Sequence, residues 1–124
     1  MTAISTDNCR QLLEVMPAPA VGLMTIATLS SALNNGLALA VSYVPDQHVL
    51  TRAGFDAYVR ALESAPVTTP EALAALVAGD VSNELVPKWL RVTVNRSSNG
   101  AVNHSVTVED RQPGWDHTSM FKSP

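Results

Sequence analysis

The chain has little charge, few aromatic side chains and a single cysteine. Only 15% of its 124 residues are charged and 5% are aromatic, whereas 46% are hydrophobic, which predicts a folded domain and excludes a disordered chain. The single Cys9 excludes an internal disulfide and a cysteine-rich zinc site within one chain, and it fits a reducing cytoplasm. This length predicts one domain, and the weakly charged surface favours burial against further copies in a homo-oligomer.

Basic patches and membrane-spanning runs are also lacking. The formal net charge is −3 and the eight Lys and Arg residues are scattered, so neither nucleic acid nor an anionic membrane is an expected partner. The start, "MTAISTDNCRQ", has no basic region followed by an apolar core, so no secretory signal is expected. The apolar stretch 19–44 is interrupted by "SSALNNG", which favours two strands over a membrane span. A cytoplasmic protein is therefore expected.

Hydrophobic periodicity predicts an α+β domain with the element order ββααββ. The expected strands are 21–30, 37–45 and the two arms of a hairpin within 88–115, and the expected helices are 51–64 and a second one that Thr68 or Thr69 caps and Pro87 stops. A short helix from residues 5–7 to about Met16 precedes them. Two helices should cover one face of a four-stranded antiparallel sheet, and a neighbouring subunit should cover the other. The domain should span 21–110, between an N-terminal helix and linker (1–20) and an irregular tail (111–124).

The hairpin carries a histidine on its apolar face. Val102, His104, Val106 and Val108 alternate along the second arm, and Asn103 and its neighbours form a wetter face opposite. A histidine in such a position is either a satisfied core residue or a general acid or base in an interface pocket, where a nearby carboxylate would tune its pKa.

The phrases "VSYVPD", "VPKWLRV" and "HSVTVEDRQPGW", in this order of strands and helices, resemble the tunnelling fold. Within that superfamily, residues 36–110 are most similar to the NADPH-dependent 7-cyano-7-deazaguanine reductases, the nitrile reductases of queuosine biosynthesis. The resemblance implies a barrel of several subunits with active sites between them. It also implies that a glutamate near the start of the second helix, here Glu71, anchors a purine-like base. The alternative for Glu71 is a capping box, because Thr68 to Glu71 has the required spacing.

The redox motifs of that family are missing from the sequence. Where the family has its nucleophilic cysteine in a Cys-Pro-x-Thr-Gly-Gln-Pro-Asp phrase, this chain reads "TLSSALNNG", with Asn35 near the family's acidic residue. The nicotinamide-binding Glu-x-Lys-Ser phrase corresponds to "TRAGFDAY", in which Arg52 and Tyr58 remain. The Arg-Gly-Gly phrase corresponds to "NGA" at 99–101. The thioimide chemistry therefore loses its nucleophile, and no cofactor is expected.

These residues predict one site and leave three functions open. His104 and Glu71 are the candidate catalytic residues, and Arg52, Tyr58, Arg91 and Asn103 are the candidate substrate-binding residues. The scattered histidines, including His48 and His117, lack metal-ligand spacing, so no metal is expected within one chain. The first interpretation is a non-redox enzyme that performs acid–base chemistry, by cyclisation, dehydration or hydrolysis, on a small planar or carbonyl-rich metabolite, and secondary metabolism would suit the lost motifs. The alternatives are a non-catalytic binding or scaffold protein and a divergent nitrile reductase that uses Cys9.

Overall fold

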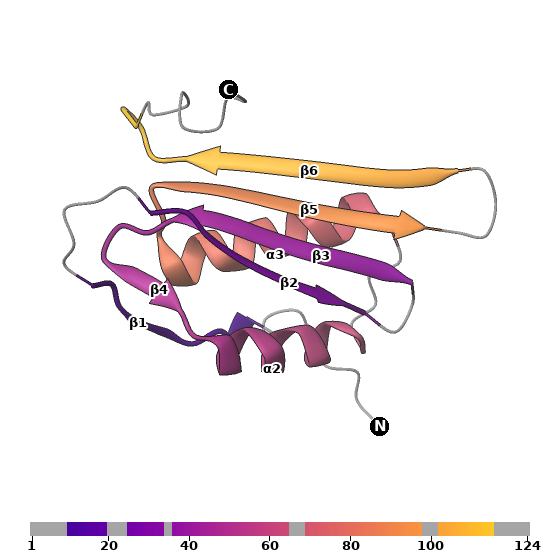
Figure 1. Ribbon diagram of the computed structural model, residues 1–124, viewed down its shortest axis with the longest axis horizontal. Coiled ribbons are helices and arrows are strands. Elements are labelled where there is room, and N and C mark those ends of the chain that lie inside the picture. The colour runs from indigo at the N-terminus through magenta and orange to yellow at the C-terminus, as the bar shows by residue number, and fades with distance from the viewer. Residues whose placement is uncertain (1–9, 20–24, 34–35, 65–68, 98–101, 116–124) are drawn as a thin grey trace.

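The computed structural model describes residues 10–19, 25–33, 36–64, 69–97 and 102–115, and it has the predicted α+β architecture (Figure 1). Its elements follow the chain as β1 (Val15–Pro17), β2 (Ala27–Ala32), β3 (Leu37–Val44), β4 (His48–Leu50), α2 (Arg52–Leu62), α3 (Pro70–Leu85), β5 (Trp89–Ser97) and β6 (Asn103–Arg111). Four of the strands form an antiparallel sheet in the order β2-β3-β5-β6, and β1 pairs with β4 in a separate ribbon.

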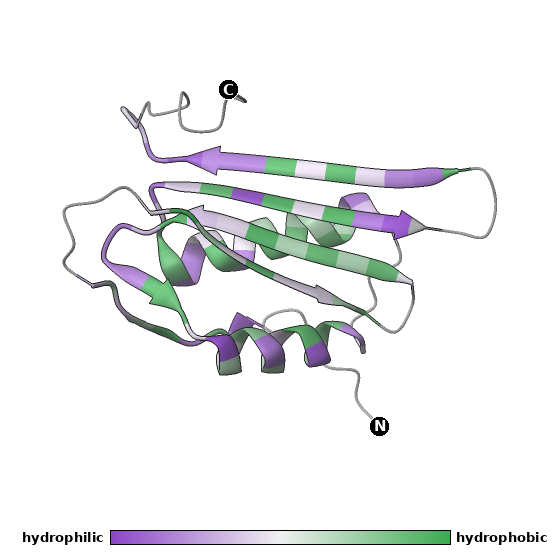
Figure 2. Cartoon of the chain, viewed as in Figure 1, coloured by the Kyte–Doolittle hydropathy of each residue, from purple (hydrophilic) through white to green (hydrophobic). Residues whose placement is uncertain are grey.

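The sheet has one buried face, which the alternation of side chains predicts. Along β3 the buried positions are Leu37, Leu39, Val41 and Tyr43, as expected, and on β5 they are Leu90, Val92 and Val94. Leu39, Val41 and Tyr43 are the register partners of Val94, Val92 and Leu90 across the central pair of strands. Figure 2 shows the same alternation of apolar and polar positions on β6. This face forms the core of the domain, because both helices contribute their apolar stripes to the same cluster.

Both helices begin at threonine caps. The Thr51 hydroxyl accepts the Gly54 N–H (3.0 Å) at the start of α2, and the Thr69 hydroxyl accepts the Ala72 N–H (3.1 Å) at the start of α3. The predicted helices are thus confirmed within a few residues at each end. In Figure 1, α3 lies behind the sheet, where it packs on β5 and β6, and α2 packs near β2.

A buried polar contact joins the two helices. Tyr58 on α2 is fully buried, and its hydroxyl donates a hydrogen bond of 2.7 Å to Oδ2 of Asp80 on α3, which is 8% exposed. The Tyr43 hydroxyl is also buried and accepts the Leu50 N–H (3.0 Å). A buried polar group must keep a partner to avoid its desolvation cost, so both tyrosines fix neighbouring elements in place.

The expected N-terminal helix is wrong in its last part. Residues 5–9 lie outside the described part of the chain, but Val15 and Met16 belong to β1, which pairs antiparallel with β4. The Thr51 N–H also donates to the Glu14 carbonyl (2.9 Å), which extends this pairing. Pairing with a distant segment overrides local helix preference here. The first strand of the main sheet is also shorter at its start than expected, because Thr25 and Ile26 precede β2.

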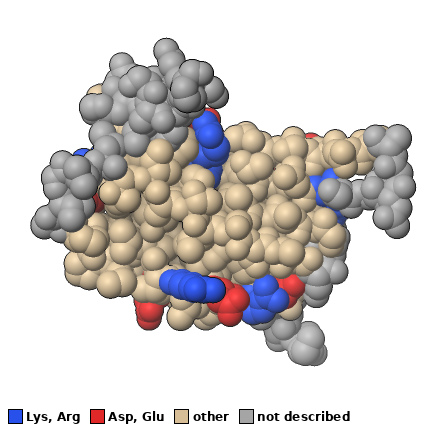
Figure 3. Space-filling view, viewed as in Figure 1, with Lys and Arg blue, Asp and Glu red and all other residues tan. Residues whose placement is uncertain are grey.

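The opposite face of the sheet carries polar and small side chains. Thr28 and Ser42 form a hydrogen bond across β2 and β3 (2.9 Å), and Arg91 donates from Nε and a terminal NH₂ to Glu109 across β5 and β6 (3.0 and 2.8 Å). The Arg91 guanidinium also lies 5.0 Å from the centre of the Trp89 ring. Figure 3 shows this face as broadly uncharged, with charged side chains gathered along the lower edge, over α2. None of the described helices has the length and apolar character needed to cross a bilayer.

Candidate functional site

The structure brings the two predicted catalytic residues into contact. His104, near the start of β6, places Nε2 2.7 Å from Oε2 of Glu71 in the first turn of α3. The contact joins residues 33 positions apart, because α3 begins beneath the end of the hairpin where β6 starts. The His104 side chain is 42% exposed and the Glu71 side chain is 60% exposed. His104 is therefore not a core histidine, although it lies on the predicted face with Val106 and Val108.

The position of the cap decides what Glu71 does. Thr69 is the N-cap of α3, so Glu71 is the second helical residue, one position too early for a capping box. The capping-box alternative is therefore wrong. A carboxylate in the first turn is favourable because the unpaired N–H groups of the helix start carry partial positive charge. Glu71 is thus free to contact β6 while it also stabilises the start of its own helix.

The pKa of Glu71 is lowered, which fixes the direction of its hydrogen bond. The largest cause is a hydrogen bond that the carboxylate accepts from its own backbone N–H, followed by the hydrogen bond from His104. These outweigh the opposing effect of desolvation, and the charge of His104 lowers the pKa by a smaller amount. An ionised carboxylate can only accept a proton from its partner. Nε2 of His104 therefore carries hydrogen, and Nδ1 is the nitrogen with a free lone pair when the ring is neutral. Across the described residues, no protein group bonds Nδ1.

A cation lies next to this pair that the sequence analysis did not select. Arg96 on β5 is the direct register partner of His104 on β6. Since Leu90, Val92 and Val94 face the helices, the alternation along β5 also directs Arg96 to that face. The Arg96 side chain is half-buried and its Nε is fully buried. Only the register between the strands could have revealed this neighbour, and the register depends on the length of the connection between them.

The other predicted residues lie elsewhere on the molecule. Arg91 is on the opposite face of the sheet, bonded to Glu109, and Asn103 pairs with Ser97 on that same opposite face, one residue before His104. Arg52 is exposed at the start of α2, and Tyr58 is fully buried with its hydroxyl on Asp80. A substrate-binding role for these four residues stays a prediction, and only Asn103 is a chain neighbour of the His104 and Glu71 pair.

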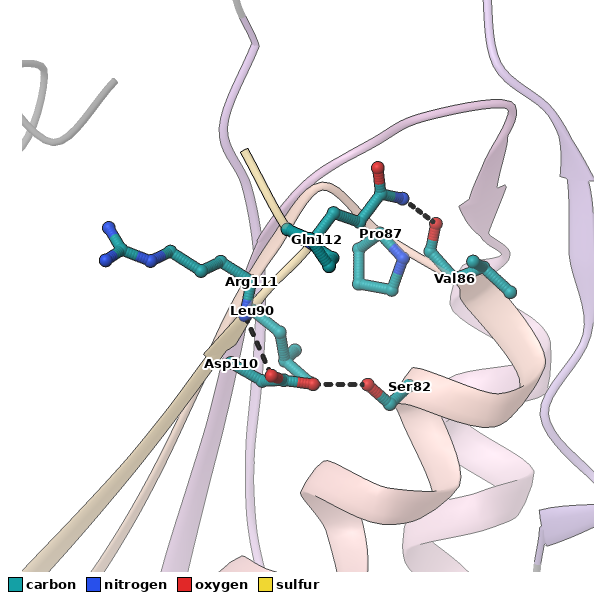
Figure 4. Close-up of a pocket in the computed structure, with 8 residues that line it drawn as sticks. Ser82, Val86, Pro87, Leu90, Asp110, Arg111 and Gln112 are labelled. Carbon is teal, nitrogen blue, oxygen red and sulfur yellow. Dashed lines mark hydrogen bonds between the residues drawn. The ribbon is translucent and has the colours of Figure 1, made fainter. Parts of the chain in front are cut away.

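The surface also has a groove away from the His104 and Glu71 pair. A groove of about 340 Å³ lies at the far end of α3 and is lined by Ser82, Val86, Asp110 and neighbouring residues. Figure 4 shows the Ser82 hydroxyl on the Asp110 carboxylate and the Gln112 amide on the Val86 carbonyl, which tie α3 to the end of β6. Among the residues that the structure covers, no three His, Cys, Asp or Glu side chains gather to hold a metal ion.

Two proteins of similar sequence are named NADPH-dependent 7-cyano-7-deazaguanine reductase. The chain is 29% identical over 77 residues to the NADPH-dependent 7-cyano-7-deazaguanine reductase of Syntrophus aciditrophicus, covering 62% of this chain and 54% of that protein. It is 27% identical over 86 residues to the enzyme of the same name from Nitrosococcus oceani, covering 69% and 66%. The crystal structure of the archaeosine synthase QueF-Like in the apo form superposes with a TM-score of 0.51 at 21% identity, over 70% of this chain and 90% of that one.

The chain has the tunnelling fold and is similar in sequence to the 7-cyano-7-deazaguanine reductases. The expected resemblance and fold are thereby confirmed. No family model matches the sequence. The matched segment spans about half the length of the Syntrophus reductase and about two thirds of the Nitrosococcus one. The similarity therefore supports the architecture, and the activity of this chain has to be argued from its own residues.

Proposed function

We propose that this tunnelling-fold relative is a non-redox enzyme in which His104 and Glu71 perform acid–base chemistry on a small planar or carbonyl-rich metabolite. The observation that carries the proposal is the 2.7 Å contact between His104 Nε2 and Glu71 Oε2. A histidine whose one nitrogen is held by a carboxylate presents the other as a general base, and the carboxylate stabilises the imidazolium that forms. Removal of a proton next to a carbonyl, followed by its return elsewhere, is the step common to cyclisation and dehydration.

The absent cysteine supports a non-redox reaction. The segment that corresponds to the nucleophile phrase of the nitrile reductases, "TLSSALNNG", has no thiol, and Cys9 lies outside the described residues. Reduction of a nitrile through a covalent thioimide needs that nucleophile. A divergent reductase that uses Cys9 would have to bind NADPH, so a titration of the protein with NADPH separates the two activities.

The edges of the sheet support a site between subunits. β6 is the last strand of the sheet and pairs only with β5 among the strands that the structure describes. Its sequence, "NHSVTVEDR", contains neither proline nor lysine, the residues that commonly protect an edge strand from pairing. We infer that a second copy adds its own edge strand to β6. The exposed His104 and Glu71 would then lie at the boundary between two copies and be enclosed there.

Deuterium uptake tests the proposed chemistry without knowledge of the substrate. The full chain is incubated in D₂O with a panel of small carbonyl compounds, and exchange at carbons next to the carbonyl is followed by NMR. We expect catalysed exchange for at least one compound and its loss in His104→Ala and Glu71→Ala. His48→Ala, in β4, and Glu84→Gln, on α3, are matched controls away from the pair. Exchange that survives in both site variants would refute the assignment.

Native mass spectrometry separates the enzyme from a scaffold protein. A closed oligomer that retains a small planar ligand after gentle purification would support a pocket at the interface and give the chemical class of the ligand. A well-packed oligomer that holds no ligand and catalyses no exchange would instead favour the non-catalytic alternative. A bare monomer would contradict the placement of the site between subunits.

A further inference from the structure

Arg96, His104 and Glu71 bring three different charged or titratable groups together from three elements. Directly opposed residues of an antiparallel pair have Cβ atoms about 4.5–5.5 Å apart on one face. Arg96 and His104 are such a pair, and Glu71 meets His104 from the start of α3. An arginine on the neighbouring strand and a carboxylate at the start of α3 therefore both lie next to His104.

The guanidinium group has the chemistry to bind an anionic substrate. It stays charged at all physiological pH values, and its planar fork of N–H donors matches a carboxylate with two parallel hydrogen bonds. Arg91, on the same strand, donates two hydrogen bonds to Glu109 on the far face. Arg96 points instead to the face that carries the His104 and Glu71 pair.

We propose that Arg96 binds an anionic oxygen of the substrate beside His104, so that this site takes small carboxylates with an acidic carbon next to the anionic group. This inference rests on the proposed function, and it names the substrate class and the residue that selects it. Neither Arg52, which is exposed on α2, nor Arg91, which lies on the far face, is placed to do this.

The proposed proton transfer involves only the substrate and these three residues. Nδ1 of His104 takes the proton as the C–H bond breaks, and the electron pair of that bond moves into the adjacent carbonyl to form an enolate oxygen. Arg96 neutralises the negative charge at the oxygen, and Glu71 holds the imidazolium through Nε2–H. Return of the proton to another atom, or departure of a leaving group as the enolate collapses, regenerates neutral His104.

Binding of a matched pair of probes tests the assignment. Malonate and malonamide share one skeleton, but only malonate carries carboxylates. Each is titrated into the full chain while the ring protons of His104 are followed by NMR, in the unaltered protein and in Arg96→Gln, Arg96→Lys and Arg60→Gln. Arg60 is an exposed α2 residue paired with Glu63, so its substitution removes the same charge elsewhere.

We expect malonate to shift the His104 signals saturably and malonamide not to. Arg96→Gln should weaken malonate binding by about tenfold or more, the loss expected for charge-assisted hydrogen bonds, and Arg60→Gln should not change it. Arg96→Lys keeps the charge but not the planar pair of guanidinium N–H donors, so a smaller loss of malonate affinity is expected. If Arg96→Gln does not fold, the affinity of Arg96→Lys is the test. Equal binding of the two probes, or unchanged affinity in the Arg96 variants that fold, overturns the inference.

Failure of this inference and failure of the proposed function give different results. Binding of malonate that depends on Arg96, without deuterium uptake by any compound, would retain the anion site and refute the enzyme. Catalysed uptake that is equally fast for neutral and anionic compounds and unaffected in the Arg96 variants would retain the enzyme and refute the anion site.

Discussion

Removal of the Tyr58 hydroxyl is expected to destabilise the fold measurably. Tyr58 is fully buried, and its hydroxyl donates to Asp80 at 2.7 Å, so Tyr58→Phe deletes the contact without changing the packing of the ring. Loss of the donor to a buried acceptor such as the Asp80 carboxyl group costs about 1–3 kcal/mol. We expect a loss of about 2 kcal/mol in the free energy of unfolding, which for 124 residues corresponds to a fall of about 8 °C in Tm.

A second buried tyrosine supplies the control. The Tyr43 hydroxyl accepts a hydrogen bond from the Leu50 N–H, a contact between neutral groups, so Tyr43→Phe should cost about 1 kcal/mol. Urea unfolding of both variants, and of Tyr58→Phe combined with Asp80→Asn, measures the contribution of the carboxyl group. The reasoning is refuted if Tyr58→Phe costs less than about 0.5 kcal/mol, the size of an ordinary surface effect.

Three other predictions concern Glu71, Val86 and Gly54. Because the pKa of Glu71 is lowered in the folded state, its interactions stabilise the protein above the unfolded pKa of 4.5 and are lost as the pH falls through the folded pKa. In Glu71→Gln the free energy of unfolding, measured with urea at several pH values, should therefore fall less steeply as the pH is lowered into the acid range. An equally steep fall in both proteins would contradict this. Val86 caps the end of α3 in the left-handed conformation (φ 49°), which favours glycine, and its side chain is 58% exposed. Val86→Gly should therefore stabilise the protein by about 1 kcal/mol in thermal melts. A lower Tm would show instead that packing of the valine side chain contributes more than the strain costs. A Cβ on Gly54 would lie 2.6 Å from Glu14 Cβ, so Gly54→Ala should destabilise by about 1–3 kcal/mol despite the better helix propensity of alanine; circular dichroism melts no lower than those of the unaltered protein would refute the clash.

Periodicity predicted most of the fold because the main elements each bury one regular stripe. The alternation along β3 and the helical spacing of Phe55, Tyr58, Val59 and Leu62 identified faces that the structure confirms. The β1–β4 ribbon was missed because three-residue strands are too short to show a period, and their pairing joins Val15 to the distant Leu50. His48 also lies in this ribbon, as the first residue of β4.

The candidate site was predictable in part. His104 stood out because a titratable residue interrupts an apolar alternation, and Glu71 because it lies near a helix start. Their contact, however, depends on the choice of Thr69 over Thr68 as the cap, which moves Glu71 by one helical position. Arg96 gave no signal of its own, because its place beside His104 is set by strand register, and a shift of one residue would have sent it to the other face.

The strand order β2-β3-β5-β6 also shapes how the chain folds. The outer pairs are hairpins closed by residues 33–36 and 98–102, whereas the central ladder joins β3 to β5 across residues 45–88, which include both helices. Closing so long a segment costs entropy before any contact compensates for it. The β3–β5 ladder should therefore be the slow step: in stopped-flow experiments Val92→Ala should mainly slow refolding, whereas Leu50→Ala in the short ribbon should mainly speed unfolding. Until that ladder forms, the two hairpins are separate units, and the buried face that they share does not yet exist.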